Sequence, residues 1–305
     1  MSDIRFDGKV AIITGAGNGL GRSHALELAS RGAKIVVNDL GGARDGTGGS
    51  LGPAETVVKE ITDAGGEAIA NGANVTKDDE VKAMVDEAVA KWGRVDILVN
   101  NAGILRDKTF HKMSFEDYRM VIDVHLLGSA LCAHTVWPMM REQGFGRIVC
   151  TSSPSGLHGI FGQANYGAAK AAMIGMMNAL HLEGSKYNIR VNLLSPSART
   201  RMTEDLGMPE PVLEALTPEA ITAALVYLVS DDAPSRAIVS CAGGGYARGY
   251  IVETYGVYLP PAEQTAEGVA AAWEAISDTS TVHYYDNSNG PIQNFMGKAM
   301  AQNKG

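Results

Sequence analysis

The sequence predicts an α/β fold in which a doubly wound parallel sheet is covered by helices on both faces. Short runs rich in β-branched and aliphatic residues alternate along the chain with longer segments of helical periodicity. The strand-like runs are apolar throughout, which is typical of strands that are buried on both faces. Because a strand–helix–strand order requires crossover connections, the strands are expected to pair in parallel.

The elements follow one another in strand–helix pairs. Apolar runs predict the strands, and amphipathic or alanine-rich stretches after them predict the helices, where Gly32 and Gly65–Gly66 supply the C-terminal stop signals of two helices. The expected strands are 9–14, 33–39, 67–75, 95–100, 146–151 and 189–195, and the expected helices are 19–32, 53–66, 78–93, 114–142 and 162–180.

Two stretches do not fit a minimal domain of this class. The glycine-rich segment 41–53 is either a flexible linker or an ordered loop beside a ligand. After Pro260, the segment 262–278 has the pattern of one amphipathic helix, and a polar, poorly patterned end follows. We expect one domain over 1–260 and a C-terminal helical extension, 261–305, that packs on it.

Composition excludes several classes of protein. A net charge of −8 over 305 residues, without a basic cluster, argues against a nucleic-acid surface. The three cysteines lack metal-ligand spacing and are expected to be reduced core residues, and no metal site is expected. No signal peptide, membrane span or C-terminal retention address is recognised, which favours a cytoplasmic protein.

A glycine-rich turn follows the first expected strand and opens the first expected helix. In TGAGNGLG, residues 14–21, Gly15, Gly19 and Gly21 allow a tight turn, close approach of backbone to a pyrophosphate, and close packing of helix on strand. Glycine-rich turns are common, but this one has the strand and helix that a Rossmann-type dinucleotide site requires.

Two further signals lie at the ends of strands. Asp39 ends the second strand, where a carboxylate binds both adenine-ribose hydroxyls and repels a 2′-phosphate, so NAD is favoured over NADP; a helix cap or turn residue is the alternative. NNAG, residues 100–103, ends the fourth strand, and Ala102 and Gly103 would allow the dinucleotide to approach closely. An ordinary β-turn is the alternative there.

Tyr166 and Lys170 are four residues apart at the start of a helix, so a phenol and an ammonium share one face. For an isolated pair of this kind, a solvated surface contact is the simpler interpretation. Ser153 lies thirteen residues before Tyr166 in a serine-rich segment, TSSPS, where a turn serine is the simpler interpretation.

The ordered set TGAGNGLG, NNAG, TSS at 151–153 and Tyr166-x-x-x-Lys170 resembles the short-chain dehydrogenase/reductase family. Within that family, VVNDLGG, NNAGILRD, FGQANYGAAK and SARTRMT are most similar to the (3R)-hydroxyacyl-CoA dehydrogenase portion of the peroxisomal multifunctional β-oxidation enzymes. The resemblance implies that Ser153, Tyr166 and Lys170 are catalytic. It also implies NAD contacts, which we expect at Gly15, Asn18, Gly19, Leu20, Asp39, Asn74, Val75, Asn101, Ala102, Gly103, Tyr166, Lys170, Pro196 and Thr200.

The chemistry that the resemblance implies makes one physical demand. A free tyrosine has a pKa near 10, too high for an efficient base at neutral pH. The Lys170 cation and the positive nicotinamide are expected to stabilise the phenolate and to lower the pKa of Tyr166 by about two or three units. Tyr166 would then remove the hydroxyl proton of an alcohol, while Ser153 orients the same oxygen.

The chain departs from the family pattern at three places. His125 stands where the family has an asparagine of a proton relay, and a buried core histidine is the simpler interpretation. Asn74 replaces an aspartate that faces adenine. Pro196-Ser197 replaces Pro-Gly, and both Thr200 and Thr203 lie near the position of a threonine that binds the carboxamide.

The substrate is open to more than one interpretation. The first hypothesis is NAD-dependent oxidation of a (3R)-hydroxyacyl-CoA, with 197–216 as a lid and Arg106, Arg199 and Arg201 as candidate phosphate contacts or plain surface residues. A hydroxysteroid dehydrogenase and a catalytically silent dinucleotide sensor are the alternatives. The apolar outer face of the Tyr166 helix favours a homodimer or homotetramer.

Overall fold

The computed structural model describes residues 3–199 and 209–302 of the chain. The chain divides into two compact units, Met1–Arg248 and Gly249–Gly305. The first unit carries the whole large sheet, and the second is a small helical unit. The predicted boundary at residue 260 and the packing of the extension on the domain stay predictions.

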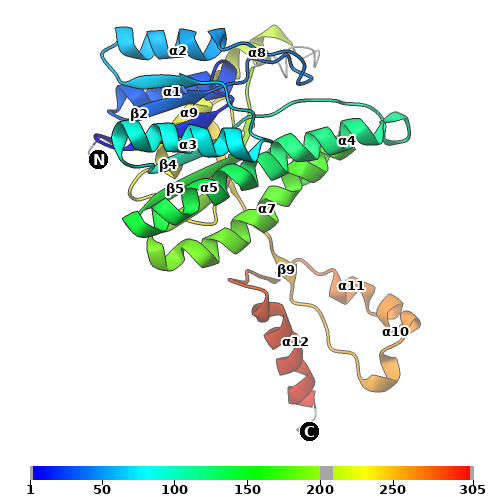
Figure 1. Cartoon of the computed structure of the whole chain (residues 1–305). Coiled ribbons are helices and arrows are strands. Elements are labelled where there is room, and N and C mark those ends of the chain that lie inside the picture. Colours follow the sequence, from blue (N-terminus) through cyan, green and yellow to red (C-terminus); the bar gives the residue numbers. More distant parts are fainter. Residues whose placement is uncertain (1–2, 200–208, 303–305) are drawn as a thin grey trace. The chain divides into compact units, whose positions relative to one another are not determined.

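The first unit is built on one eight-stranded sheet with the order β3-β2-β1-β4-β5-β6-β7-β8 (Figure 1). Paired registers show that β3 through β7 run parallel to their neighbours. Gly243 and Gly244, both with positive φ, connect β7 to β8, and a connection this short joins only antiparallel strands. The strands are β1 (Val10–Thr14), β2 (Lys34–Asn38), β3 (Ala68–Asn71), β4 (Ile97–Asn100), β5 (Gly146–Thr151), β6 (Ile189–Ser197), β7 (Ile238–Ala242) and β8 (Gly245–Gly249).

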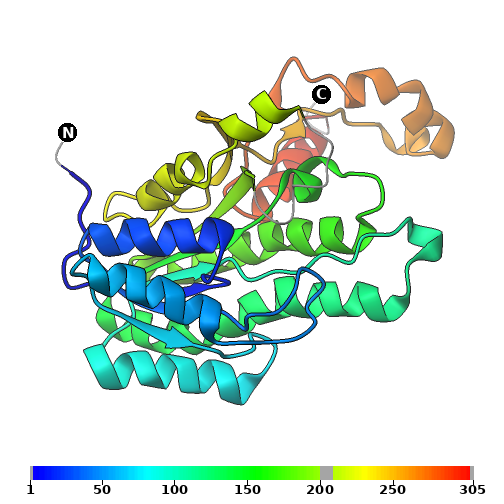
Figure 2. The ribbon, with the colours of Figure 1, turned by 90° about the horizontal axis from the view of Figure 1, so that it is seen from above.

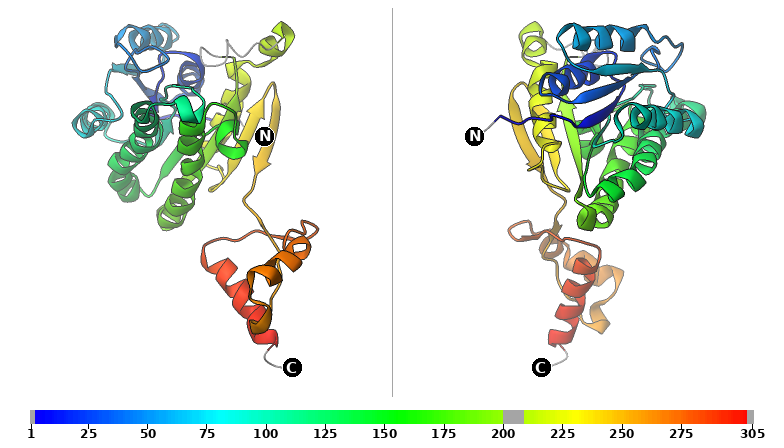
Figure 3. Two further views of the ribbon diagram at one scale, coloured as in Figure 1. Left: turned by 90° about the vertical axis from the view of Figure 1, so that its right-hand side faces the viewer. Right: turned by 60° about the vertical axis from the view of Figure 1, so that its left-hand side comes forward.

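Helices cover both faces of this sheet (Figure 3), which confirms the predicted doubly wound fold. Helices α1 and α2 lie side by side (Figure 2) and pack on one face with α9, while α3, α5 and α7 pack on the other. The helices are α1 (Gly19–Ser30), α2 (Gly52–Asp63), α3 (Asp78–Trp92), α4 (Phe115–Ile122), α5 (Gly128–Gln143), α6 (Pro154–His158), α7 (Ala164–Gly184), α8 (Glu210–Ala215) and α9 (Pro218–Leu228).

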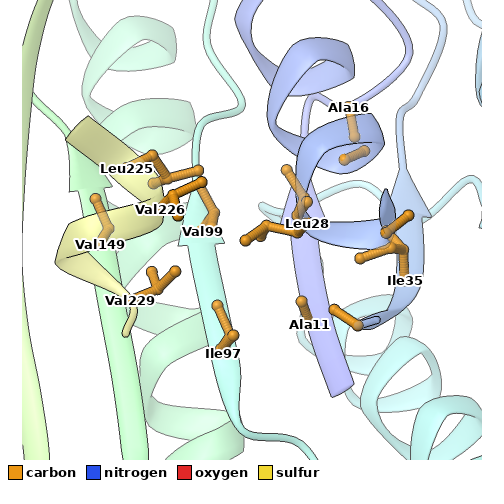
Figure 4. Packing of buried hydrophobic residues seen from close by; sticks show 14 of the residues in the cluster. Ala11, Ala16, Leu28, Ile35, Ile97, Val99, Val149, Leu225, Val226 and Val229 are labelled. Carbon is orange, nitrogen blue, oxygen red and sulfur yellow. The ribbon is translucent and has the colours of Figure 1, made fainter. Parts of the chain in front are cut away.

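The core consists of two apolar layers, one on each face of the sheet. Figure 4 shows part of the first layer, where Leu28 of α1 and Leu225 of α9 pack over Ile97 and Val99 of β4. All four side chains are 0% exposed. Cys132, Cys150 and Cys241 are free and buried, as expected for reduced core residues.

The segment predicted as one helix over 114–142 is interrupted. Helix α4 ends at Ile122, and a π-helical turn, Asp123–Leu127, precedes α5. Such a turn accommodates an extra residue inside a helix and commonly marks a functional site. It contains His125, whose side chain is buried at 1% exposure.

In its described residues, 249–302, the second unit contains three α-helices and a small antiparallel pair of strands. Its elements are β9 (Glu253–Thr254), α10 (Ala266–Ala271), α11 (Trp273–Ile276), β10 (Val282–His283) and α12 (Asn289–Gln302). The prediction of one helix over 262–278 was wrong, because the chain leaves helical geometry at Ala272 between α10 and α11. The polar end contains a helix that the pattern did not predict. None of the described residues of this unit is buried, and the apolar side chains that α12 carries at helical spacing, Ile292, Phe295, Met296 and Met300, are exposed.

Two helical stretches, Phe115–Gln143 and Glu210–Leu228, have the length and apolar composition of a membrane span. Two such helices are weak evidence, so they do not overturn the expectation that the chain has no membrane span. In the first unit α5 packs on α3 and β5, and α9 packs on α1 and β7. Core helices of globular domains pass the same test of length and composition, so it carries little weight here.

Candidate active site

A cavity of about 610 Å³ opens at the carboxyl edge of the parallel sheet. It lies where the strand order reverses between β1 and β4, which is the ligand-binding position of doubly wound sheets. All predicted site residues within the described ranges line it: Gly15, Asn18, Gly19, Leu20, Asp39, Asn74, Val75, Asn101, Ala102, Gly103, Ser153, Tyr166, Lys170 and Pro196. Thr200 and Thr203 lie outside the described residues.

The glycine turn after β1 packs tightly against its own backbone and against the turn after β4. A Cβ on Gly15, whose φ is +64°, would lie 2.9 Å from Cα of Ala102, and a Cβ on Gly21 would lie 2.2 Å from the carbonyl oxygen of Gly15. Asn18 precedes α1, and its side chain makes no capping hydrogen bond within the described chain. The N–H groups of the first helical turn therefore remain available for an anion.

Asp39 lies at the end of β2, and backbone hydrogen bonds fix its carboxylate. Oδ2 accepts from the N–H of Gly17 at 2.7 Å, and Oδ1 accepts from the N–H of Gly41 at 2.7 Å. Because each carboxylate oxygen can accept a further hydrogen bond, the group is oriented and still able to bind ribose hydroxyls. Asn74 is held similarly, since its Oδ1 accepts from the N–H of Thr76 at 3.0 Å.

The turn after β4 is tied to the turn after β1. Thr14 Oγ1 accepts from the N–H groups of Asn101 and Ala102, each at 3.0 Å. The side-chain Nδ2 of Asn101 donates to the carbonyls of Thr14 and Gly15, both at 3.0 Å. The Asn101 amide thus holds the two cofactor turns together, a structural role that the motif alone did not reveal.

The three predicted catalytic residues meet at the other end of the cavity. Ser153 caps α6, and its Oγ accepts from the N–H of Ser155 at 3.2 Å. Tyr166 and Lys170 occupy the first turns of α7, with Lys170 Nζ 5.5 Å from the centre of the Tyr166 ring. Lys170 is 3% exposed, and its Nζ donates to the carbonyl of Thr151 at 2.5 Å.

In the chain without a bound coenzyme, the pKa of Tyr166 is not lowered, so the expected lowering, which relied on the nicotinamide charge as well as on Lys170, stays a prediction. Burial raises the pKa of Tyr166 above its usual value, and a hydrogen bond with Ser153 opposes this only in part. Burial also lowers the pKa of Lys170 to about 7, so the amine is only partly protonated at neutral pH. A half-neutral lysine stabilises a phenolate weakly, and sequence spacing alone does not reveal this desolvation.

His125 contacts both cofactor and catalytic parts of the site. Its ring packs edge-on against Tyr166, with 5.1 Å between ring centres, and its Nε2 lies 2.8 Å from the carbonyl oxygen of Ile104. A Cβ on Gly103 would lie 2.3 Å from Cε1 of this ring. Burial, with repulsion from Lys170, holds the pKa of His125 well below its usual value, so the ring is neutral.

The residues fit a dinucleotide coenzyme. Thr151 Oγ1 and His125 Nδ1 are buried in the cavity lining without a hydrogen-bond partner among the described residues. The N–H groups at the glycine turn could donate to a phosphate, and the carboxylate of Asp39 could accept hydrogen bonds from ribose hydroxyls. A coenzyme spanning the cavity would bring its nicotinamide end toward Tyr166 and its adenosine end toward Asp39.

The candidate phosphate contacts are occupied elsewhere. Arg106 donates to the carbonyl of Asp45 at 2.9 Å and to the carboxylate of Asp117 at 2.8 Å. Arg199 pairs with Glu210 at 2.8 Å on the surface, and Arg201 lies outside the described residues. A coenzyme A phosphate contact at Arg106 is therefore not supported, because its guanidinium is bound within the chain.

Several cavity residues were not predicted from the sequence. Those without any signal include Leu40, Met120, Ile160 and Gln163. The lining residues Gly42, Ala43, Arg44 and Gly46 belong to the glycine-rich loop, for which an ordered position beside a ligand was one of the two alternatives, and Leu216 ends the segment that was expected to form a lid. The sequence signal for the glycine-rich loop was its position between the end of a strand and the start of a helix. The apolar members belong to loops and helix ends that carry no motif.

A Rossmann-type sheet, a glycine turn, a carboxylate after the second strand and a Ser–Tyr–Lys set around one cavity are typical of nicotinamide-dependent oxidoreductases. Residues 9–210 match the short chain dehydrogenase family. The chain belongs to this family and is an oxidoreductase of it.

Relatives of similar length support this assignment. The chain is 48% identical over 275 residues to the short-chain type dehydrogenase/reductase Rv0148 of Mycobacterium tuberculosis, covering 89% of this chain and 95% of the relative. It is 36% identical over 309 residues to the hydroxyacyl-CoA dehydrogenase ChsB1 of the same organism, covering 94% and 92%.

A longer relative is peroxisomal multifunctional enzyme type 2 of Drosophila melanogaster, 43% identical over 281 residues, which are 91% of this chain but 46% of that enzyme. The chain thus spans about half of its length. Its solved structure matches with a TM-score of 0.81 over 98% of this chain and 50% of that one, at 33% identity. A 7α-hydroxysteroid dehydrogenase complexed with NADH and 7-oxo glycochenodeoxycholic acid matches with a TM-score of 0.72 at 32% identity, covering 80% and 98%.

Proposed function

We propose that the protein oxidises the secondary alcohol of a (3R)-hydroxyacyl-CoA to the 3-oxoacyl-CoA with NAD as the coenzyme. The observation that carries the proposal is one continuous cavity with Asp39 at one end and Ser153, Tyr166 and Lys170 at the other. A ribose-selecting acceptor and a proton acceptor are thereby separated along a single dinucleotide-binding groove.

The preference for NAD rests on the fixed carboxylate of Asp39. Hydrogen bonds from Gly17 and Gly41 hold both of its oxygens in the cavity lining. A 2′-phosphate at this position would meet a carboxylate that cannot turn away without losing those bonds. Like charges at such close range are strongly unfavourable where solvent is excluded.

When bound, the coenzyme supplies the hydride acceptor and a positive charge beside Tyr166. With that charge beside it, Tyr166 would be present as a phenolate, and its Oη would accept the proton of the substrate hydroxyl. Its side chain shares a hydrogen bond with Ser153 and lines the same cavity. Ser153 donates to the substrate oxygen and orients it. Lys170, anchored on the carbonyl of Thr151, adds positive charge when it is protonated.

The acyl-CoA proposal draws on the relatives that are named for it. A hydroxyacyl-CoA dehydrogenase aligns with 94% of this chain. The structure of the fly multifunctional enzyme aligns with 98% of this chain, which includes the second unit. Apolar side chains at Met120, Ile160 and Leu216 give the cavity walls that an acyl chain would contact.

A hydroxysteroid is the second candidate substrate. The favouring observation is the match to a hydroxysteroid dehydrogenase over 80% of this chain with a TM-score of 0.72. The same catalytic arrangement serves a ring hydroxyl and an acyl-chain hydroxyl, so only the cavity walls distinguish the two substrates.

Steady-state kinetics test both the proposed substrate and the proposed coenzyme. We expect higher kcat/KM for a (3R)-hydroxyacyl-CoA than for its (3S) isomer or a bile acid, and higher kcat/KM with NAD than with NADP. Faster turnover of the steroid would favour the second candidate. Faster turnover with NADP would contradict the role of Asp39.

Tyr166→Phe tests the enzymatic role against that of a silent dinucleotide sensor. We expect the variant to bind NADH and to lose turnover, whereas Tyr227→Phe, at a tyrosine that is 49% exposed on α9, should retain it. Unchanged NADH production by Tyr166→Phe would overturn the proposed mechanism. A wild type that binds NADH and oxidises no alcohol would favour the sensor.

We further propose a homodimer or homotetramer built on α7. Leu182 of this helix is 51% exposed, and a Cβ on Gly175 would meet no described atom within 4 Å, so the outer face can receive a second helix. Sedimentation equilibrium would report the assembly. The cytoplasmic location stays a prediction, and relatives that carry peroxisomal names make fractionation its direct test.

A further inference from the structure

Arg106 ties the glycine-rich loop to the segment that follows the NNAG turn. Its Nε donates to the carbonyl of Asp45 in the loop at 2.9 Å, and its Nη1 donates to the carboxylate of Asp117 on α4 at 2.8 Å. The two side chains of this ion pair are 20% and 19% exposed. The guanidinium therefore bridges two elements that are far apart in the sequence, in a partly shielded position.

Backbone contacts continue the connection between loop and segment. The N–H of Leu105 donates to the carbonyl of Arg44 at 3.0 Å. A Cβ on Gly46, whose φ is +87°, would lie 3.2 Å from the side chain of Ile104, so the loop rests closely on this segment. Residues 104–108, which we call the strap, therefore pack against the glycine-rich loop.

The other end of the strap holds the start of the catalytic helix. Asn165, which is 0% exposed, donates from Nδ2 to the carbonyl of Arg106 at 3.0 Å and accepts the N–H of Tyr166 on Oδ1 at 2.7 Å. The amide side chain of Gln163 donates to Asp107 at 2.6 Å and accepts from Ser155 Oγ at 2.9 Å.

The strap therefore joins two ends of the cavity. Gly42, Ala43, Arg44 and Gly46 line the end near Asp39, while Asn165 precedes the residue that faces the substrate. A loop with this many glycines loses much conformational freedom when it is ordered on a ligand. Contacts of the strap that hold the loop in place before the ligand binds reduce this entropic cost. They also couple the position of the loop to the start of α7.

We propose that Arg106 is a positioning residue that couples coenzyme binding at the glycine-rich loop to the placement of Tyr166. The coupling is reciprocal: what stabilises the loop against the strap also stabilises the start of α7. The proposal rests on the proposed function for its catalytic consequence, but not for its effect on NADH binding.

The test compares Arg106→Met, Arg106→Lys and the control Arg119→Met, whose arginine lies exposed on α4 over the ring of Phe115. Fluorescence titration gives the Kd of NADH, and steady-state kinetics give kcat and the KM of each substrate. We expect Arg106→Met to raise the Kd of NADH by roughly 3- to 30-fold and to lower kcat, with little change in the KM of the alcohol.

Arg106→Lys distinguishes loss of the hydrogen bond to the Asp45 carbonyl from loss of folding stability. Lysine keeps a charge for Asp117 but lacks the second directed N–H for the Asp45 carbonyl, so we expect a wild-type Tm together with a raised Kd of NADH. Arg119→Met should match the wild type in every measurement. A variant series in which only Tm falls, with Kd and kcat unchanged, would reduce Arg106 to a structural residue and overturn the proposal.

Hydrogen exchange reports the coupling directly. NADH should slow exchange at the Tyr166 amide in the wild type, and in Arg106→Met it should slow exchange in the loop alone. Equal protection of Tyr166 in both proteins would contradict the coupling. If the wild type binds NADH but oxidises no alcohol, the proposed function fails while these two measurements still decide the coupling. If it binds no NADH, both proposals fail.

Discussion

Replacing Lys170 by methionine should stabilise the coenzyme-free protein near neutral pH while abolishing turnover. Lys170 is 3% exposed, and burial lowers its pKa from 10.5 to about 7. Because the folded-state value lies below the unfolded one, the unfolded chain binds more protons between pH 7 and about 10. The stability of the wild type should therefore rise with pH through this window.

The size of the effect follows from the displaced pKa. Each pKa unit corresponds to about 1.4 kcal/mol, so a fall from 10.5 to about 7 corresponds to roughly 3–5 kcal/mol of stability that is absent at pH 7 and recovered by pH 10. Methionine does not titrate, and it removes the hydrogen bond to the Thr151 carbonyl, which costs about 1 kcal/mol at every pH.

Urea denaturation of both proteins, without coenzyme and at fixed ionic strength, measures the difference. Lys170→Met should be more stable than the wild type at pH 7 and slightly less stable at pH 10, so that the two stability curves cross. Other titrating groups occur in both proteins and largely cancel in the difference. A difference that stays flat from pH 7 to pH 10 would refute the assignment of a desolvated, partly neutral lysine.

Three further substitutions test the rest of the cavity. Gly103→Ala should destabilise the fold by about 1–3 kcal/mol in urea denaturation, because the new Cβ would lie 2.3 Å from the His125 ring; a loss below about 0.5 kcal/mol would show that the ring is not fixed there. His125→Asn should lower kcat with little change in the KM of NAD, because it removes the ring that packs on Tyr166; a change confined to that KM would argue for a coenzyme contact instead. Asp39→Ser should raise the NADP-to-NAD ratio of kcat/KM by about tenfold or more, since it removes the fixed charge at the ribose position; an unchanged ratio would place coenzyme selection elsewhere.

Much of the regular fold up to β6 was predictable because its signals are local, whereas α9, β7 and β8 were not among the expected elements. Strands buried on both faces are continuous apolar runs, so β1, β2, β4, β5 and β6 were located within a few residues. The second unit was not predicted in detail: the pattern over 262–278 indicated one helix where the chain forms two, and α12 was not recognised in the polar end. The π-helical turn was also missed, since it changes the hydrogen-bond pattern and leaves the hydrophobic pattern intact.

The cavity residues were predictable wherever a motif fixes the backbone, as with Gly15, Asp39 and Tyr166. The ionisation of Tyr166 and Lys170 was not, because it depends on how far water is excluded from both groups, a property of the folded environment. The strap was likewise hidden, since Arg106 and Asn165 act through backbone carbonyls that any residue possesses.

The central claim is that Tyr166 accepts a proton from an alcohol held in the coenzyme cavity. Its most direct test is a single-turnover measurement in which the enzyme–NAD complex of the wild type or Tyr166→Phe is mixed with a (3R)-hydroxyacyl-CoA and NADH absorbance is followed. The wild type should form NADH at a rate that increases with pH, and the variant should form it at least about a hundredfold more slowly at every pH. Equal rates in the two proteins would contradict the claim.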